Sequence, residues 1–224
     1  MTQRPTDDTD PSDGLDPTEQ LRLVAHQEAR TRRALTVDGR FLFGAWGIAW
    51  FVGFAVMWLA TPLREGGPWV AIPGVVVGLL FFLLLVAAGI VTAVHSVRAG
   101  RGLAGPSNRI GAMYGWGWFL GFAMLPCIVL SAERLGASTG ALALLWPALS
   151  GLIVGLLYVG GAAAFDDPLQ FAIGAWLIVT TGAGCLLGLP GLYLMMCLAG
   201  GGGFLAAAAW FALHPPHRPS PGPA

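Results

Sequence analysis

Two groups of aromatic side chains recur at helical spacing in apolar parts of the chain. The groups are Trp46, Trp50 and Phe54, and Tyr114, Trp118 and Phe122. Residues four apart lie on one face of an α-helix, so each group predicts an aromatic stripe. Two stripes that faced one another would line a cavity for an apolar ligand, or for a cation held over the ring faces. The alternative is that they pack in a core and anchor helices at the membrane interface, where Trp and Tyr are common.

Four consecutive glycines, Gly200, Gly201, Gly202 and Gly203, fall within the last apolar stretch. Glycine is less favourable than alanine in a helix interior by roughly 1 kcal/mol, so this tract is the weakest point of that helix. One interpretation is a hinge, or a broken helix beside a cavity, as in transporters with discontinuous helices. The other is a groove in which a neighbouring helix packs tightly, because small residues permit close approach in lipid.

Charged side chains are absent from the apolar stretches 41–63, 66–94, 110–132, 135–165 and 168–213, which contain no Asp, Glu, Lys or Arg. Since such residues inside a membrane mark proton relays and ion pathways, we do not expect a proton-coupled mechanism. The sequence also contains no nucleotide-binding loop, nucleophile elbow or zinc motif. We therefore expect no catalytic residues, no metal ligands, no cofactor and no enzymatic activity.

The composition is that of a membrane protein. Hydrophobic residues make up 55% of the 224 residues and charged residues 11%, whereas a soluble domain carries about 25% charged residues. The formal net charge is zero, so the chain lacks the basic excess that nucleic-acid binding requires. All twelve basic residues are arginine, which we interpret as the codon bias of a GC-rich bacterial genome.

The lengths of the apolar stretches predict six crossings, since about 20 residues span the hydrocarbon core. The longest stretch is divided into two helices by a turn at Leu189, Pro190 and Gly191. We predict an all-α bundle of six transmembrane helices in three hairpins, at residues 41–62, 69–94, 110–131, 141–164, 169–188 and 191–213. A disordered acidic tail (1–15) and a cytoplasmic or interfacial amphipathic helix (16–39, begun by Asp16) are expected before this transmembrane domain (40–214), and a disordered Pro-rich tail (215–224) after it.

Parts of the sequence repeat. Residues 46–55 and 114–123 are identical at six of ten positions, and residues 69–81 and 146–158 at seven of thirteen. A fainter third copy aligns residues 171–176 with 41–46, and 189–191 with 72–74. Units with an even number of helices insert with the same polarity and are related by an axis along the membrane normal. The repeats therefore predict a bundle with threefold pseudosymmetry.

Arginine is distributed unevenly between the two sides of this bundle. If the N-terminus is inside, only Arg64 and Arg134 fall on the outer side. The positive-inside rule then predicts that both termini are cytoplasmic, in a bacterial plasma membrane. Arg98, Arg101 and Arg109 lie in the inner loop after the second crossing, where they either set the topology or dock a cytoplasmic partner.

This layout of an amphipathic helix, six crossings and an inner loop at 96–109 resembles the transmembrane subunit of ABC-2-type exporters. The resemblance implies that a cytoplasmic ATPase subunit docks on that loop, through Arg98, Arg101 and Arg109. The tight turn at Pro190 departs from that family, which has a longer re-entrant segment there, and so does the triplication. The Arg-rich helix followed by an aromatic and glycine-rich crossing is also similar to small actinobacterial six-helix membrane proteins labelled transporter.

The sequence therefore predicts an integral plasma-membrane protein that is a transporter-like or permease-like component. The alternative is a non-transporting membrane scaffold or regulatory protein. The expected partners are the lipid bilayer, a cytoplasmic ATPase subunit in the first case, and a second copy of the chain. Nucleic acid is not expected as a partner.

Overall fold

The structure is a computed structural model that describes residues 16, 18–22, 39–61, 67–100 and 106–214. The chain divides into two units, Met1–Val37 and Asp38–Ala224. In the first unit, residues 18–22 are helical, and the Asp16 carboxylate accepts the backbone N–H of Thr18 at 3.3 Å. This capping contact confirms Asp16 as the predicted helix start. Residues 17 and 23–38 of the helix predicted over 16–39, and both predicted tails, lie outside the described residues, and residue 39 belongs to the next helix.

The second unit consists of helices, with no strand among its described residues. Its elements are α2 (Gly39–Ala60), α3 (Gly74–Gly100), α4 (Pro106–Arg134), α5 (Thr139–Phe165), α6 (Pro168–Leu187), α7 (Gly191–Met195), the π-helix η1 (Met196–Gly201) and α8 (Gly202–Leu213). We call α7, η1 and α8 together the last span. With it, six helices are long and apolar enough to cross a membrane. The predicted all-α fold is confirmed, and the protein is a multi-pass membrane protein.

The helix ends follow from local side-chain chemistry. The Asp167 carboxylate accepts the backbone N–H groups of Leu169 and Gln170, both at 3.0 Å, and so caps α6. Ser138 caps α5 in the same way, through the N–H of Ala141 at 3.2 Å. The α3 helix begins directly after Pro73, five residues later than the predicted start at 69. Residues 67–73 are not helical.

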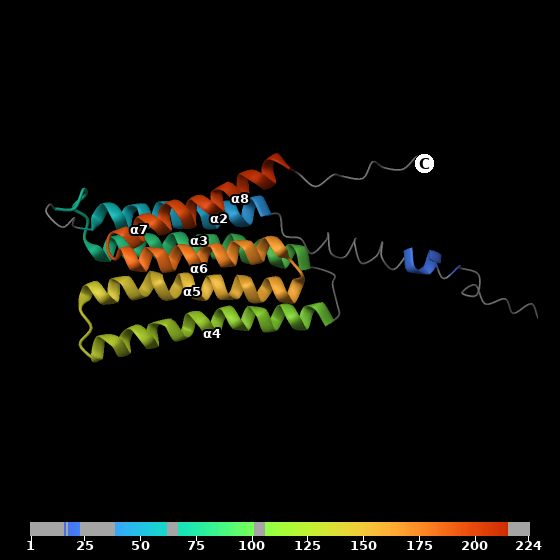
Figure 1. The fold of residues 1–224 in the computed structure, drawn as a ribbon, viewed down its shortest axis with the longest axis horizontal. Coiled ribbons are helices and arrows are strands. Elements are labelled where there is room, and N and C mark those ends of the chain that lie inside the picture. Colours follow the sequence, from blue (N-terminus) through green and yellow to red (C-terminus); the bar gives the residue numbers. More distant parts are fainter. Residues whose placement is uncertain (1–15, 17, 23–38, 62–66, 101–105, 215–224) are drawn as a thin grey trace, which may run out of the picture. The chain divides into compact units, whose positions relative to one another are not determined.

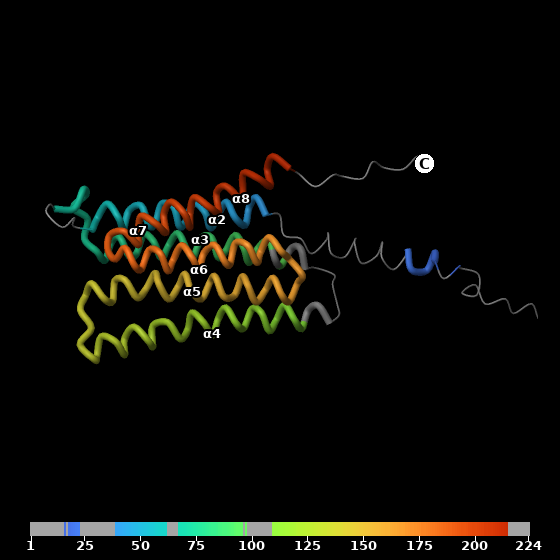
Figure 2. The backbone as a smooth tube through the Cα atoms, in the orientation of Figure 1, coloured from blue at the N-terminus to red at the C-terminus, as the bar shows by residue number. Residues whose placement is uncertain are grey.

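Consecutive helices pair as hairpins: α2 with α3, α4 with α5, and α6 with the last span. Between hairpins, α5 packs along α6, and the last span packs along α2. Neighbouring spans therefore form a series in the order α4, α5, α6, last span, α2 and α3, which begins with α4 at one edge of the bundle (Figures 1 and 2). A closed threefold ring would also need α3 against α4. Among the described helices, however, α4 packs extensively only on α5 and α3 only on α2, so the series is open.

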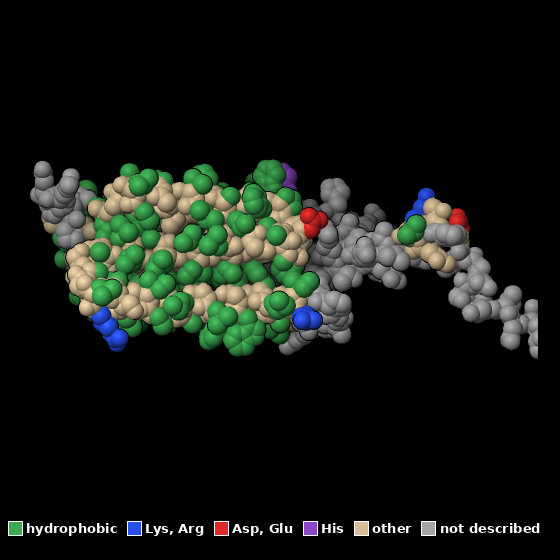
Figure 3. Space-filling model, turned by 60° about the horizontal axis from the view of Figure 1, so that its bottom comes forward, with side chains coloured by type: hydrophobic (Ala, Val, Ile, Leu, Met, Phe, Trp, Pro, Cys, Tyr) green, Lys and Arg blue, Asp and Glu red, His purple; other side chains and the backbone are tan. Residues whose placement is uncertain are grey.

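The core lies where α2, α6 and the last span meet. Leu192 and Met196 of the last span are 0% exposed and Leu177 of α6 is 1% exposed. The spans in α3 and α4 are the least covered, with 11% of each buried, compared with 39% of the last span. Hydrophobic side chains cover the flank of the bundle, and the charged side chains of the bundle visible on that face lie at its ends (Figure 3). This distribution is the one that a bilayer requires.

Candidate functional site: the π-helical segment of the last span

The four-glycine tract lies where the last span changes helical type. The π-helix η1 ends at Gly201, and the α-helix α8 begins at Gly202. Both glycines keep right-handed helical dihedral angles, with φ of −63° and −60°. The backbone therefore remains helical through the tract. Short π-helical segments inside α-helices frequently occur at functional sites, which makes this segment the first candidate.

Two glycines of the tract provide the surface on which α2 packs. A Cβ atom on Gly201 would lie 2.7 Å from the Cα of Phe51, and one on Gly200 would lie 3.0 Å from the ring of Trp50. The thiol of Cys197, one turn earlier, donates a hydrogen bond to the Phe51 carbonyl oxygen at 3.3 Å. Gly200 and Gly201 thus match the close-packing interpretation of the tract.

The opposite side of the segment borders α6. The indole Nε1–H of Trp176 donates a hydrogen bond to the Ala199 carbonyl oxygen within η1, at 2.9 Å. A Cβ atom on Gly203 would lie 3.2 Å from the same Nε1 atom. Trp176 therefore holds α6 against the π-helical segment by a directed polar contact, in a region where most contacts are apolar.

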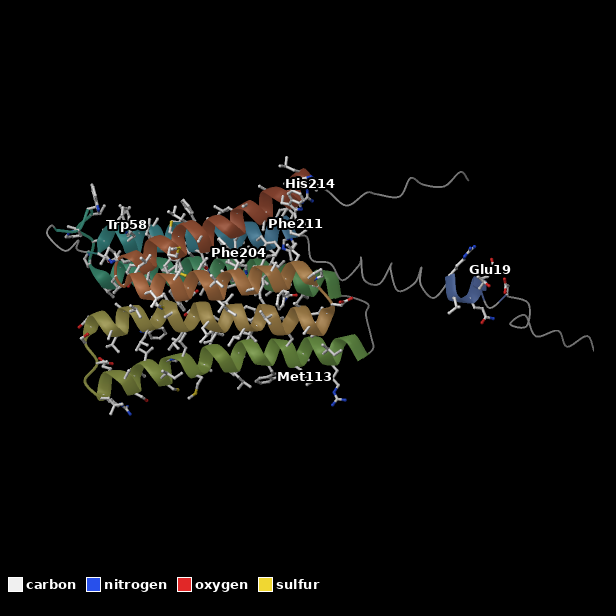
Figure 4. All side chains as sticks on the ribbon, in the orientation of Figure 1. Glu19, Trp58, Met113, Phe204, Phe211 and His214 are labelled. Atoms are coloured by element: carbon white, nitrogen blue, oxygen red, sulfur yellow. The ribbon has the colours of Figure 1, made fainter. Side chains whose placement is uncertain are left out.

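A cavity of about 250 Å³ lies between α6 and this segment. It is partly open, and its walls are Ala172, Ile173, Trp176, Leu177, Gly200, Gly203 and Phe204. Phe204 lies on the last span, where Figure 4 labels it, and is only 3% exposed. Since the walls are apolar and the Trp176 N–H already has its acceptor, the cavity suits a hydrocarbon chain rather than a polar solute.

The first predicted stripe packs against its neighbours. The Nε1–H of Trp46 donates to the Thr92 hydroxyl at 2.9 Å, which joins α2 to α3. Trp50 is 4% exposed and meets Phe54 and Phe204 edge to face, with ring centroids 5.7 and 5.4 Å apart. These contacts fill the space beside the stripe with protein side chains.

The second stripe packs mainly against side chains of α5 and α6. Tyr114 meets Phe165 of α5 edge to face, and its hydroxyl accepts a hydrogen bond from the Gln170 amide of α6 at 3.1 Å. Trp118 meets Tyr158 of α5 edge to face at 6.1 Å, and Phe122 is 39% exposed. Because α2 and α4 are not neighbours in the series, the two stripes do not face one another directly. Trp118 is instead joined to Trp50 through Tyr158 and Phe204, whose ring centroids are 6.2 Å apart, in one aromatic core. The cavity-lining role of the stripes stays a prediction.

The three predicted docking arginines fall near the junction of α3 and α4. Arg101 lies outside the described residues. Arg98 is in the last turns of α3, and its side chain is likewise not described. Arg109 is exposed in the first turn of α4. The structure therefore neither groups these side chains nor separates them.

Trp176 is the residue of this site that the sequence reasoning missed. The faint third copy aligned it with Trp46, and this alignment was the available signal. Among residues 16, 18–22, 39–61, 67–100 and 106–214, no group of three or more His, Cys, Asp or Glu side chains could hold a metal ion. No protein-family model, curated protein or solved structure matches the chain.

Proposed function

We propose that this protein is a non-transporting membrane scaffold, that is, a bundle whose helices pack to present their outer faces to partners in the bilayer. The observation that carries the proposal is the burial of Trp50, which is 4% exposed and enclosed by aromatic rings. A transport pathway along the first stripe would need this side chain to face a cavity. In a scaffold the same ring stabilises the contact between α2 and the last span.

The hydrogen bonds of the bundle interior support the same function. The Thr180 hydroxyl donates to the Trp176 carbonyl oxygen at 2.8 Å, and the Thr181 hydroxyl contacts the Met196 sulfur at 3.5 Å. In the described part of the chain, no buried side-chain nitrogen or oxygen is without a hydrogen-bond partner. A solute pathway needs polar groups free to exchange partners, so this interior suits fixed packing better.

The second candidate is the permease-like component. The cavity beside η1 favours it, because a π-helical segment next to a tract of glycines can change its packing at low cost. The layout shared with ABC-2-type exporters adds a cytoplasmic ATPase subunit as its partner, docked through Arg98, Arg101 and Arg109. In both candidates we place the protein in a bacterial plasma membrane with its termini in the cytoplasm, from the arginine distribution.

We also infer that the first two hairpins descend from one repeated unit. Gly53 and Gly121 occupy the same position of the ten-residue repeat. Both face the second helix of their own hairpin: a Cβ atom on Gly53 would meet the Phe81 ring of α3, and one on Gly121 would lie 3.0 Å from Ile153 of α5. Equivalent positions of the first helix therefore both face the second helix of their own hairpin, although the partner residues differ, since Phe81 aligns with Tyr158 and not with Ile153.

Water access to Cys197 distinguishes the two candidates. The test uses a chain in which Cys127 and Cys185 are alanine, treated in native membranes with a membrane-impermeant maleimide. Cys197 is buried beside α2, so a scaffold leaves it unlabelled until the protein is unfolded in SDS. A control cysteine in place of the exposed Ser138 should react at once. Reaction of Cys197 in the folded protein would refute the scaffold and favour a pathway opened by movement of η1.

A further inference from the structure

Contact between hairpins follows one rule in this bundle. The second helix of one hairpin packs on the first helix of the next, as α5 does on α6 and the last span on α2. Both contacts are close at glycines. A Cβ atom on Gly174 of α6 would lie 2.8 Å from the Gly155 carbonyl oxygen of α5, and one on Gly47 of α2 would lie 2.9 Å from the Leu205 backbone nitrogen. This close backbone approach is how small residues join helices in lipid.

The first helix of the second hairpin, α4, carries a glycine at the corresponding position, but no described residue packs on it. Gly115 of α4 has the position in the ten-residue repeat that Gly47 has in α2. Gly47 receives α8, whereas a Cβ atom on Gly115 would meet no atom within 4 Å. Beside Gly115, Trp116 and Phe119 are 62% and 61% exposed. We call Gly115, Trp116 and Phe119 the open face of α4.

At the opposite end of the series, α3 also has glycines on which no described helix packs. Gly74 and Gly78 of α3 align with Gly151 and Gly155 of α5 in the second repeated segment. Gly155 lies against α6, where a Cβ atom would be 2.5 Å from the Ile178 side chain. A Cβ atom on Gly74 or Gly78 would meet nothing within 4 Å. Gly74 and Gly78 lie in the first turns of α3, whereas Gly115 lies nine residues from the start of α4, and α4 starts where α3 ends. Gly89 lies on the same face of α3 as Gly78 but about 16 Å further along the helix, and a Cβ atom on it would also meet nothing within 4 Å. Gly89 and Gly115 are thus open glycines at the same depth, one at each end of the series.

We propose that a second copy of this chain completes that contact, with its α3 packed along the open face of α4. In the series, the helix that packs on the first helix of a hairpin is the second helix of another hairpin. In the described bundle, α3 is the one second helix whose glycines are uncovered, so α3 of a second copy is the helix expected on α4. Such a contact is head to tail, so it builds a ring or a linear assembly rather than a twofold dimer. The inference goes beyond the proposed function, because a second copy could occupy this face in a permease as well.

The test is cysteine crosslinking between two differently tagged chains in the same membrane. Both chains lack Cys127 and Cys185 and retain the buried Cys197. One carries Gly89→Cys and the other Trp116→Cys, at open or exposed positions at the same depth of the bundle. A crosslinked species of twice the chain mass that contains both tags is expected. Neither variant expressed alone should give a crosslinked species of twice the chain mass.

Two controls keep the result interpretable. Gly182 of α6 is also exposed, and a Cβ atom there would meet nothing within 4 Å, so Gly182→Cys paired with Trp116→Cys should not crosslink. Adding Gly115→Leu to the Trp116→Cys chain should abolish the mixed species, whereas adding Gly182→Leu should leave it.

Three outcomes would overturn the proposal. The first is absence of the mixed species for Gly89→Cys with each of Ala112→Cys, Trp116→Cys and Phe119→Cys, which together cover a one-turn difference in register. The second is equal crosslinking by the Gly182→Cys control. The third is crosslinking of Trp116→Cys chains only to one another, which would indicate a twofold contact between α4 helices.

Discussion

Replacement of Gly201 by alanine is expected to push α2 away from the last span, whereas the same replacement at Gly202 is expected to stabilise the protein. The added methyl group at position 201 would lie 2.7 Å from the Cα of Phe51 and 2.9 Å from its Cβ. Carbon atoms in contact are about 3.5–4.0 Å apart, so α2 must move by roughly 1 Å. The neighbouring backbone cannot rotate out of the way as a side chain can.

The magnitude follows from two opposing contributions. Overpacking of a well-packed contact costs about 1–3 kcal/mol. Replacement of glycine by alanine in a helix gains at most about 1 kcal/mol. For Gly201→Ala the overpacking cost dominates, and we expect a net loss of roughly 1–2 kcal/mol. At Gly202 the nearest atom to an added Cβ is 3.9 Å away, which is ordinary contact, so only the gain remains.

The measurement is the free energy of unfolding of the purified protein, from SDS titration in mixed micelles followed by the fluorescence of its tryptophans and by circular dichroism. Because the two glycines are adjacent, differences in expression, detergent binding and unfolded-state entropy largely cancel between the variants. Equal stabilisation by both substitutions would refute the reasoning, since it would mean that α2 does not rest on the backbone of Gly201.

The remaining predictions concern the contacts around this segment. Gly174→Ala should destabilise the protein by about 1–3 kcal/mol through overpacking against α5, while Gly182→Ala, on the same helix with open space around it, should be tolerated in the same SDS titration. Trp176→Phe should cost about 0.5–1.5 kcal/mol through loss of the hydrogen bond to the Ala199 carbonyl; a Phe variant of wild-type stability would contradict this role. Asp167→Ala should cost about 1 kcal/mol through loss of the α6 cap, and Asp167→Asn should restore most of it, because Asn caps equally well. Equal thermal midpoints for the two Asp167 variants would argue against the cap.

Much of the fold follows from the sequence because the bilayer imposes a strong constraint. A helix that crosses lipid must be long, apolar and internally hydrogen-bonded, and these properties can be read from composition alone. The capping role of Asp167 could be predicted as well, since capping depends on a few consecutive residues. The π-helical segment before Gly202 was not predicted, since no residue pattern in the tract indicates it. Its hydrogen bonds, from Cys197 to Phe51 of α2 and from Trp176 of α6 to Ala199, join it to residues far along the chain.

The neighbours of each helix were the hardest feature to predict. Lipid is as apolar as leucine, so hydrophobicity does not indicate which face of a transmembrane helix meets protein. Gly47 and Gly115 have almost the same local sequence, yet one lies against α8 and the other lies open. The difference comes from chain order: a hairpin precedes α2 in the series, and none precedes α4. A local motif therefore specifies a surface able to join helices, and the rest of the chain, or a second copy of it, decides whether that surface is used.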